Sequence, residues 1–238
     1  MTTSVAPGES NLKEQPASAR QAQRLRLIFS QQGVLRYVGH LDLVRTWERA
    51  LRRAGVPLAY SEGFNPQPRV FFAAALPLGA TGQRELVDVI LTEPMAPDAF
   101  LAKVNPQLPV GLTLIDASEE PLKTPALQSL MRASAWQVEV EHDDSRQALA
   151  QRIDAFLAEE VVASSRNRKG QAVTYDLRAL VLALHYEGQP EPGWHRLTMV
   201  LRSEPNATGR PDAVLRALGL GDSVARIDRL GCTFAETS

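Results

Sequence analysis

Hydrophobic and polar residues alternate over several short stretches in the first half of the chain, a pattern typical of strands buried on one face. It predicts strands over 24–29, 56–60, 70–76, 85–92 and 112–117. Apolar residues recur at helical spacing within 40–54, after the first strand, and again over 97–104. The resulting order, strand–helix–strands–helix–strand, is that of a ferredoxin-like split βαβ unit with an added strand.

The second half follows a similar order. It has predicted strands over 135–141, 161–165, 180–186, 196–202 and 224–234, and predicted helices over 145–158 and 211–218. The third and fourth of these strands are expected to form a hairpin around 187–190. We therefore expect an α+β protein made of two tandem ferredoxin-like units with antiparallel sheets. The expected units are 24–118 and 131–235, with a connector over 119–130 and a polar, disordered tail over 1–23.

The helix within 40–54 separates arginines from apolar residues. On a wheel of about 100° per residue, Asp42 shares one arc with Arg45, Arg49, Arg52 and Arg53. The opposite side carries Leu43, Val44, Trp47, Ala50, Leu51 and Ala54. Guanidinium groups make paired hydrogen bonds to phosphate oxygens, so the arginine side suits an anion-binding surface. The alternative is an ordinary solvated helix surface.

A loop over 60–69 follows this helix. Gly63 permits backbone angles that are closed to other residues, and Pro66 and Pro68 stiffen the chain. The loop is expected to present Tyr60, Phe64, Asn65, Gln67 and Arg69. Aromatic, amide and guanidinium groups of this kind can stack on an exposed base and hydrogen-bond to it. The alternative is a rigid connector with Phe64 tucked into the core.

A basic turn in the second half is the other candidate for contacts to phosphate. The run from Arg166 to Gly170 includes Arg168 and Lys169, and Asp176 and Arg178 follow it. In the functional interpretation, the turn contacts phosphate and Asp176 orients Arg178. In the alternative, it is a solvated hairpin tip.

Composition and charge narrow the possible functions. The formal net charge of −1 argues against general affinity for nucleic acid, so any basic patch must be local. The single cysteine and four scattered histidines predict no metal site or iron–sulfur cluster in this chain. His40 precedes the arginine-bearing helix and is a candidate acid/base, although a lone histidine is more often structural. The absence of a long apolar run predicts no membrane segment, and low cysteine use fits a reducing cytoplasm.

The run GHLDLVRTWERALRRAGVPLAYSEGFNPQPRVFFAAALPLG, continued by GQRELVDVILTEPM, resembles the bacterial radical-SAM-linked proteins, the DUF2344 family. The resemblance covers most of 24–232. The family usually has Ser-His where this chain has Gly39-His40, and Asn-Pro-His-Pro where it has Asn-Pro-Gln-Pro. A catalytic histidine at the second position therefore cannot apply here, because Gln67 occupies it. The resemblance implies a radical SAM partner that carries the iron–sulfur cluster and S-adenosylmethionine, and it implies no particular reaction.

Three classes of function follow from these observations. We favour a non-catalytic accessory protein that binds RNA or another anionic substrate through the arginine-faced helix and the adjacent loop. The second class is a protein–protein adaptor for the radical SAM partner. The third is an enzyme that uses His40 as its acid/base, with arginines stabilising an anion.

Overall fold

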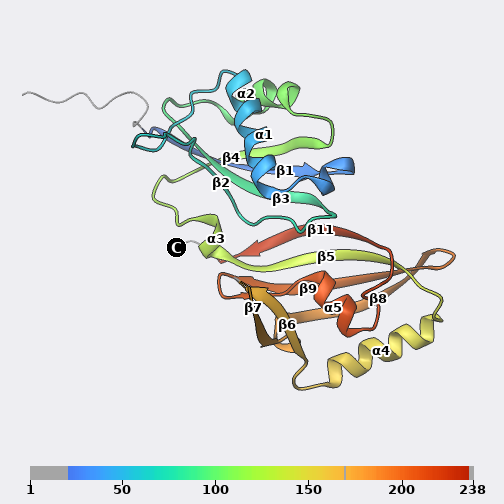
Figure 1. Ribbon diagram of the computed structural model, residues 1–238. Coiled ribbons are helices and arrows are strands. Elements are labelled where there is room, and N and C mark those ends of the chain that lie inside the picture. Colours follow the sequence, from blue (N-terminus) through green and yellow to red (C-terminus); the bar gives the residue numbers. More distant parts are fainter. Residues whose placement is uncertain (1–20, 169, 236–238) are drawn as a thin grey trace, which may run out of the picture.

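The first half of the chain forms four strands and two α-helices (Figure 1). The computed structural model describes residues 21–168 and 170–235. The strands are β1 (Gln23–Gln31), β2 (Val70–Phe72), β3 (Ala80–Leu91) and β4 (Leu112–Glu120). The helices are α1 (His40–Arg53) and α2 (Pro97–Val104), with 3-10 turns η2 (Gly33–Tyr37) and η3 (Asn105–Gln107). Of the expected tail, residues 1–20 lie outside the described residues, and Gln23 already belongs to β1.

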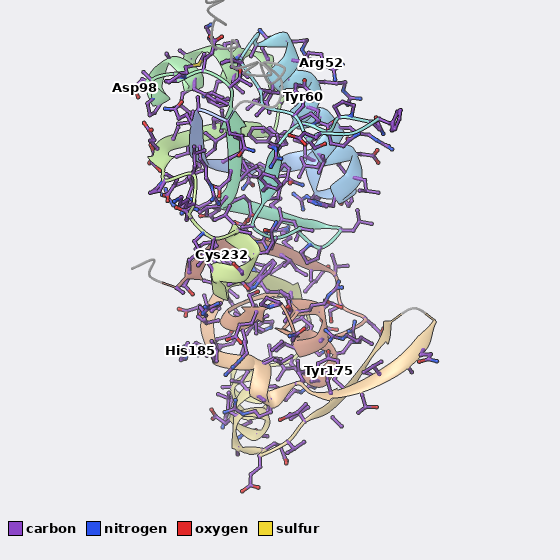
Figure 2. All side chains as sticks on the ribbon, turned by 90° about the vertical axis from the view of Figure 1, so that its left-hand side faces the viewer. Arg52, Tyr60, Asp98, Tyr175, His185 and Cys232 are labelled. Carbon is purple, nitrogen blue, oxygen red and sulfur yellow. The ribbon has the colours of Figure 1, made fainter. Side chains whose placement is uncertain are left out.

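The second half contains longer strands and a separate ribbon. Its strands are β5 (Met131–Glu141), β6 (Ala163–Arg168), β7 (Gln171–Asp176), β8 (Val181–Glu191), β9 (Trp194–Glu204), β10 (Ala207–Thr208) and β11 (Ala225–Phe234). Its helices are α3 (Leu127–Leu130), α4 (Arg146–Ala158) and α5 (Pro211–Ala217), with the 3-10 turn η4 (Arg178–Leu180). Strands β6 and β7 pair only with each other, and they form a ribbon that projects from the body (Figure 2).

One nine-stranded sheet runs through both halves, in the order β10–β9–β5–β11–β3–β1–β4, with β2 beside β3 and β8 beside β9. The last strand, β11, joins the halves because it pairs antiparallel with β5 and parallel with β3. The expected α+β class is confirmed, and the sheet is mostly antiparallel. The tandem ferredoxin-like arrangement is not confirmed, because the halves share this continuous sheet. The domain limits at 118 and 131 stay predictions.

Two hydrophobic cores lie along this sheet. In the first, α1 and α2 cover one face of β1 and β3, and the Phe29 and Trp47 rings meet edge to face with centroids 5.0 Å apart. In the second, α4 and α5 pack over β5, β8 and β9 around Trp136, Phe156 and Leu197. Burial of these faces is the main favourable contribution to folding.

Several predicted elements differ from the structure. The stretch 56–60 is no strand, because it makes only the isolated bridges Leu58–Leu91 and Tyr60–Pro68. The β8–β9 hairpin turns at 192–193, where Gly193 has φ of 77°, and not at 187–190. Register shifts around Gly188 let β8 continue through the predicted turn. Strand β4 runs to Glu120, inside the expected connector, and that connector also contains the helix α3.

Candidate anion-binding site

The four arginines of α1 are exposed, and we call Arg45, Arg49, Arg52 and Arg53 the α1 arginine face. Leu43, Trp47, Ala50 and Leu51 on the other side of the helix are buried. The helical spacing of the apolar residues therefore sets which way the arginines point, and the predicted orientation of α1 is confirmed. Gly55, with φ of 62°, lies just beyond the helix in the left-handed region that glycine adopts without strain.

Contacts within the chain use these arginines only in part. Arg45 pairs with Asp42 at 3.0 Å, but both side chains are 67% exposed, so water competes strongly with the pair. Arg49 donates to the Thr46 hydroxyl at 3.2 Å, and Arg53 donates to the carbonyl of Gln107 at 2.6 Å. The Arg52 side chain makes no hydrogen bond or ion pair with any residue in the described part of the chain. One carboxylate therefore contacts this face, and most of its positive charge is uncompensated.

The loop after α1 is closed at its neck and open at its tip. The Ser61 amide donates to the Gln67 carbonyl at 2.9 Å, and the Gln67 amide donates to the Ser61 hydroxyl at 3.0 Å. At the tip, Phe64 is fully exposed, with a relative exposure of 111%. The alternative that placed Phe64 in the core is therefore wrong. Asn65 is also exposed, and Gln67 reaches the Asn65 carbonyl at 3.4 Å.

The other two aromatic and basic candidates of the loop are placed differently. Tyr60 is half-buried and packs against the first core. Figure 2 shows Tyr60 and Arg52 at the same end of the first half. Arg69 belongs to the other face of the sheet, because its neighbours Val70 and Phe72 in sequence point into the core under α1. The structure thus places Tyr60 at the same end as Arg52 but does not place Arg69 on the α1 side.

His40 is the first residue of α1 and is exposed. Its ring meets the Phe72 ring edge to face, with centroids 5.5 Å apart. It makes no hydrogen bond or ion pair with another described residue, so nothing in the chain orients it as an acid/base. This contact gives His40 a packing role at the start of the helix.

The second-half candidates serve the local fold. The carboxylate of Asp176 accepts from the amides of Val162 and Arg178, at 3.0 and 2.9 Å. The Arg178 side chain donates to the carbonyls of Leu157 and Val181, at 3.2 and 3.0 Å. Asp176 therefore contacts the main chain of Arg178, while carbonyl groups hold the Arg178 side chain, and a phosphate contact at this turn stays a prediction. Lys169 and the side chain of Arg168 lie outside the described residues.

The structure also shows hollows that none of the predicted sites includes. One, of about 220 Å³, lies where the halves meet and is lined by residues 74–77, 208–211, Trp136, Ser203 and Arg229. A groove of about 440 Å³ separates α4 from α5. The α1 arginines line neither. The signal for the first hollow was the serines on β5 and β9, where Trp136 Nε1 donates to Ser134 at 2.8 Å and the Ser134 and Ser203 hydroxyls lie 3.2 Å apart.

Metal sites and membrane-spanning helices are two further possibilities. Among residues 21–168 and 170–235, no group of three or more His, Cys, Asp or Glu side chains is arranged to hold a metal ion. Within the same residues, every helix is too short or too polar to cross a bilayer.

Comparison with known proteins identifies one family. Residues 24–211 match the model of DUF2344, described as an uncharacterized protein conserved in bacteria. No curated protein matches the chain.

Among solved structures, a Cbf5-Nop10-Gar1 complex aligns with 12% identity over 94% of this chain and 55% of that chain, with a TM-score of 0.48. This chain thus spans little more than half the length of that one. A DypB variant of Rhodococcus jostii RHA1 in complex with heme aligns with 11% identity over 90% of this chain and 93% of that chain, with a TM-score of 0.26. TM-scores below 0.5 at this identity do not relate the chain to either protein.

Proposed function

Because the chain belongs to the DUF2344 family of proteins conserved in bacteria, we propose that it is a non-catalytic accessory protein that works with a radical SAM enzyme. It binds RNA or another anionic ligand through the α1 arginine face and the tip of the adjacent loop. The radical SAM partner rests on the sequence resemblance. The ligand class rests on the geometry of α1.

One observation carries the choice of an anionic ligand. Arg45, Arg49 and Arg52 are exposed along one side of α1, while the one carboxylate that contacts the face belongs to a highly exposed pair. Guanidinium groups in this state can exchange water and a weak partner for phosphate oxygens. In the loop that follows α1, the exposed Phe64 ring and the Asn65 side chain offer stacking and hydrogen bonds to a base.

The test is the salt dependence of RNA binding. We expect single-stranded RNA to bind with an affinity that falls with salt at a log–log slope of about −2 to −3, which corresponds to three or four phosphate contacts. Replacement of Arg45, Arg49 and Arg52 by alanine should weaken binding and flatten this slope. Fluorescence anisotropy of a labelled oligonucleotide over a salt series measures both quantities.

A matched control removes the same charge elsewhere. Arg132, Arg146 and Arg216 are exposed arginines of the second half, and their replacement by alanine changes the net charge equally. This control should keep the affinity and the slope of the parent protein. Equal loss in both triple variants would mean that binding follows net charge alone, and unchanged binding in the α1 triple variant would eliminate the α1 arginine face as the site.

The adaptor interpretation has one specific observation in its favour. Val34, Tyr37, Leu41 and Leu78 are each at least 70% exposed, and the Gly79 amide donates to the Arg36 carbonyl at 2.7 Å, which brings the turn at 78–79 to η2. Clustered exposed apolar side chains are typical of protein-binding surfaces. An adaptor should hold a radical SAM enzyme after nuclease treatment and lose it on substitution of Leu41 and Leu78 by serine. The RNA-binding interpretation requires neither result.

A further inference from the structure

Arg69 lies at the neck of the loop, on the face of the sheet opposite to α1. Its amide donates to the Ala59 carbonyl at 2.9 Å and its carbonyl accepts from the Ile90 amide at 3.0 Å, so its main chain is fixed. Val70 and Phe72 pack into the core beneath α1. Because successive side chains of an extended chain point to opposite faces, Arg69 and Phe71 point away from α1.

Other arginines share this face. In the register of β1 and β3, Arg24 lies opposite Ile90 and Arg26 lies opposite Asp88. The side chains of Arg24 and Arg26 therefore point to the same face of the sheet as Arg69. The Arg24 Nε donates to Asp88 at 2.9 Å, and the Arg26 Nε donates to the same carboxylate at 3.0 Å. Arg26 also contacts Glu120 at 3.1 Å. The carboxylates of Asp88 and Glu120 thus contact Arg24 and Arg26, and no carboxylate of the described residues contacts Arg69.

The Arg69 guanidinium has no partner in the described chain. Its Nε is buried without a hydrogen bond, and neither terminal nitrogen makes a hydrogen bond or ion pair with a described residue. The terminal nitrogens are not among the buried unpartnered atoms, so they reach solvent. A half-buried charge without a counter-ion is costly, and an aliphatic side chain would fill the same space without that cost.

We infer that Arg69 binds an oxyanion, the phosphate or carboxylate group of a ligand, at this second face. The two terminal nitrogens form one side of the planar fork that matches two oxygens of such a group. Phe71, which points the same way and is 41% exposed, provides an apolar border that reduces competition from water. The site is separate from the α1 arginine face and goes beyond the function proposed for that face.

Thermal unfolding in different anions tests the inference. At matched ionic strength, inorganic phosphate should raise the melting temperature of the parent protein above its value in chloride by about 2–4 °C more than it does for Arg69→Met. The comparison between variants is needed because phosphate also stabilises proteins generally, by exclusion from their surface. The control Arg84→Met removes an exposed arginine, without a partner among the described residues, and should keep the full increment.

The outcomes of this experiment support or overturn an oxyanion site at Arg69. An increment lost only in Arg69→Met supports the site, and a parallel series in acetate shows whether carboxylate also binds. The α1 triple variant should keep the part of the increment that depends on Arg69, so failure of the proposed function leaves this result intact. Equal increments in the parent, Arg69→Met and Arg84→Met overturn the inference. If Arg69→Met does not fold, Arg69→Gln provides the same comparison.

Discussion

Single side chains at the junction of the halves depend on pairing partners far away in the sequence. Arg229 on β11 and Glu85 on β3 form an ion pair whose side chains are 3% and 4% exposed. Arg229 also donates to the Ala74 carbonyl at 3.0 Å. The sequence does not mark either residue as buried, because no periodicity shows that β3 and β11 are neighbours. Removal of one partner strongly destabilises the fold, because it leaves the other charge buried without a counter-ion.

We therefore expect Glu85→Gln to lower the free energy of unfolding by about 3–5 kcal/mol. The double variant Glu85→Met with Arg229→Met should recover much of this loss, because it leaves no buried charge. Urea unfolding followed by circular dichroism measures all three proteins. Glu204→Gln, which breaks a partly exposed pair with Arg202, is the control and should change little. A loss in Glu85→Gln no larger than in this control would contradict the argument.

Cys232 gives a second prediction at this scale. Burial is the main cause that raises the pKa of its thiol from 9.0 to about 11. The thiolate is the reactive form, so at pH 8 the folded protein holds about a hundredfold less of it than an ordinary cysteine does. Alkylation by iodoacetamide at pH 8 should be correspondingly slow in the native protein and fast in urea. Similar rates in the two states would show that the thiol is accessible and unperturbed.

At the scale of elements, the sequence was most informative where one local pattern decides the structure. The spacing of Leu43, Trp47 and Leu51 was enough to place α1 and to orient its arginines. It failed where a residue's partners come from other elements. The Arg178 side chain, for example, donates to carbonyls at the end of α4 and the start of β8. Residue type alone had indicated phosphate chemistry there.

The loop tip makes a testable element. Because Phe64 is fully exposed, Phe64→Ala should change the free energy of unfolding by less than about 0.5 kcal/mol. In the RNA-binding interpretation, it should weaken binding to single-stranded RNA about tenfold through the loss of one stacked base, with the salt slope unchanged. Leu182→Ala, at an exposed apolar residue of β8, is the control for stability and binding. A flattened salt slope in Phe64→Ala would contradict a stacking role.

At the scale of the whole molecule, the sequence predicted where strands lie along the chain better than which strands pair with each other. Strand β11 was correctly expected over 224–234, but nothing in its pattern indicates that Ile227 lies between Val138 of β5 and Ala80 of β3. Pairing across the halves depends on tertiary geometry, which a single strand's period of two does not encode. This one strand turns two expected sheets into a continuous sheet.

The shared strand has a consequence for unfolding. Loss of either half would leave one edge of β11 unpaired and expose the side chains packed on that side, so we expect both halves to unfold in one transition. Tryptophan fluorescence can separate them, because Trp47 reports on the first core and Trp136 on the second. A variant that keeps only Trp47 and another that keeps only Trp136 should each give a urea midpoint equal to that from circular dichroism of the same protein. Fluorescence and circular dichroism midpoints that differ within either variant would mean that the halves are separate folding units, as the sequence pattern alone indicated.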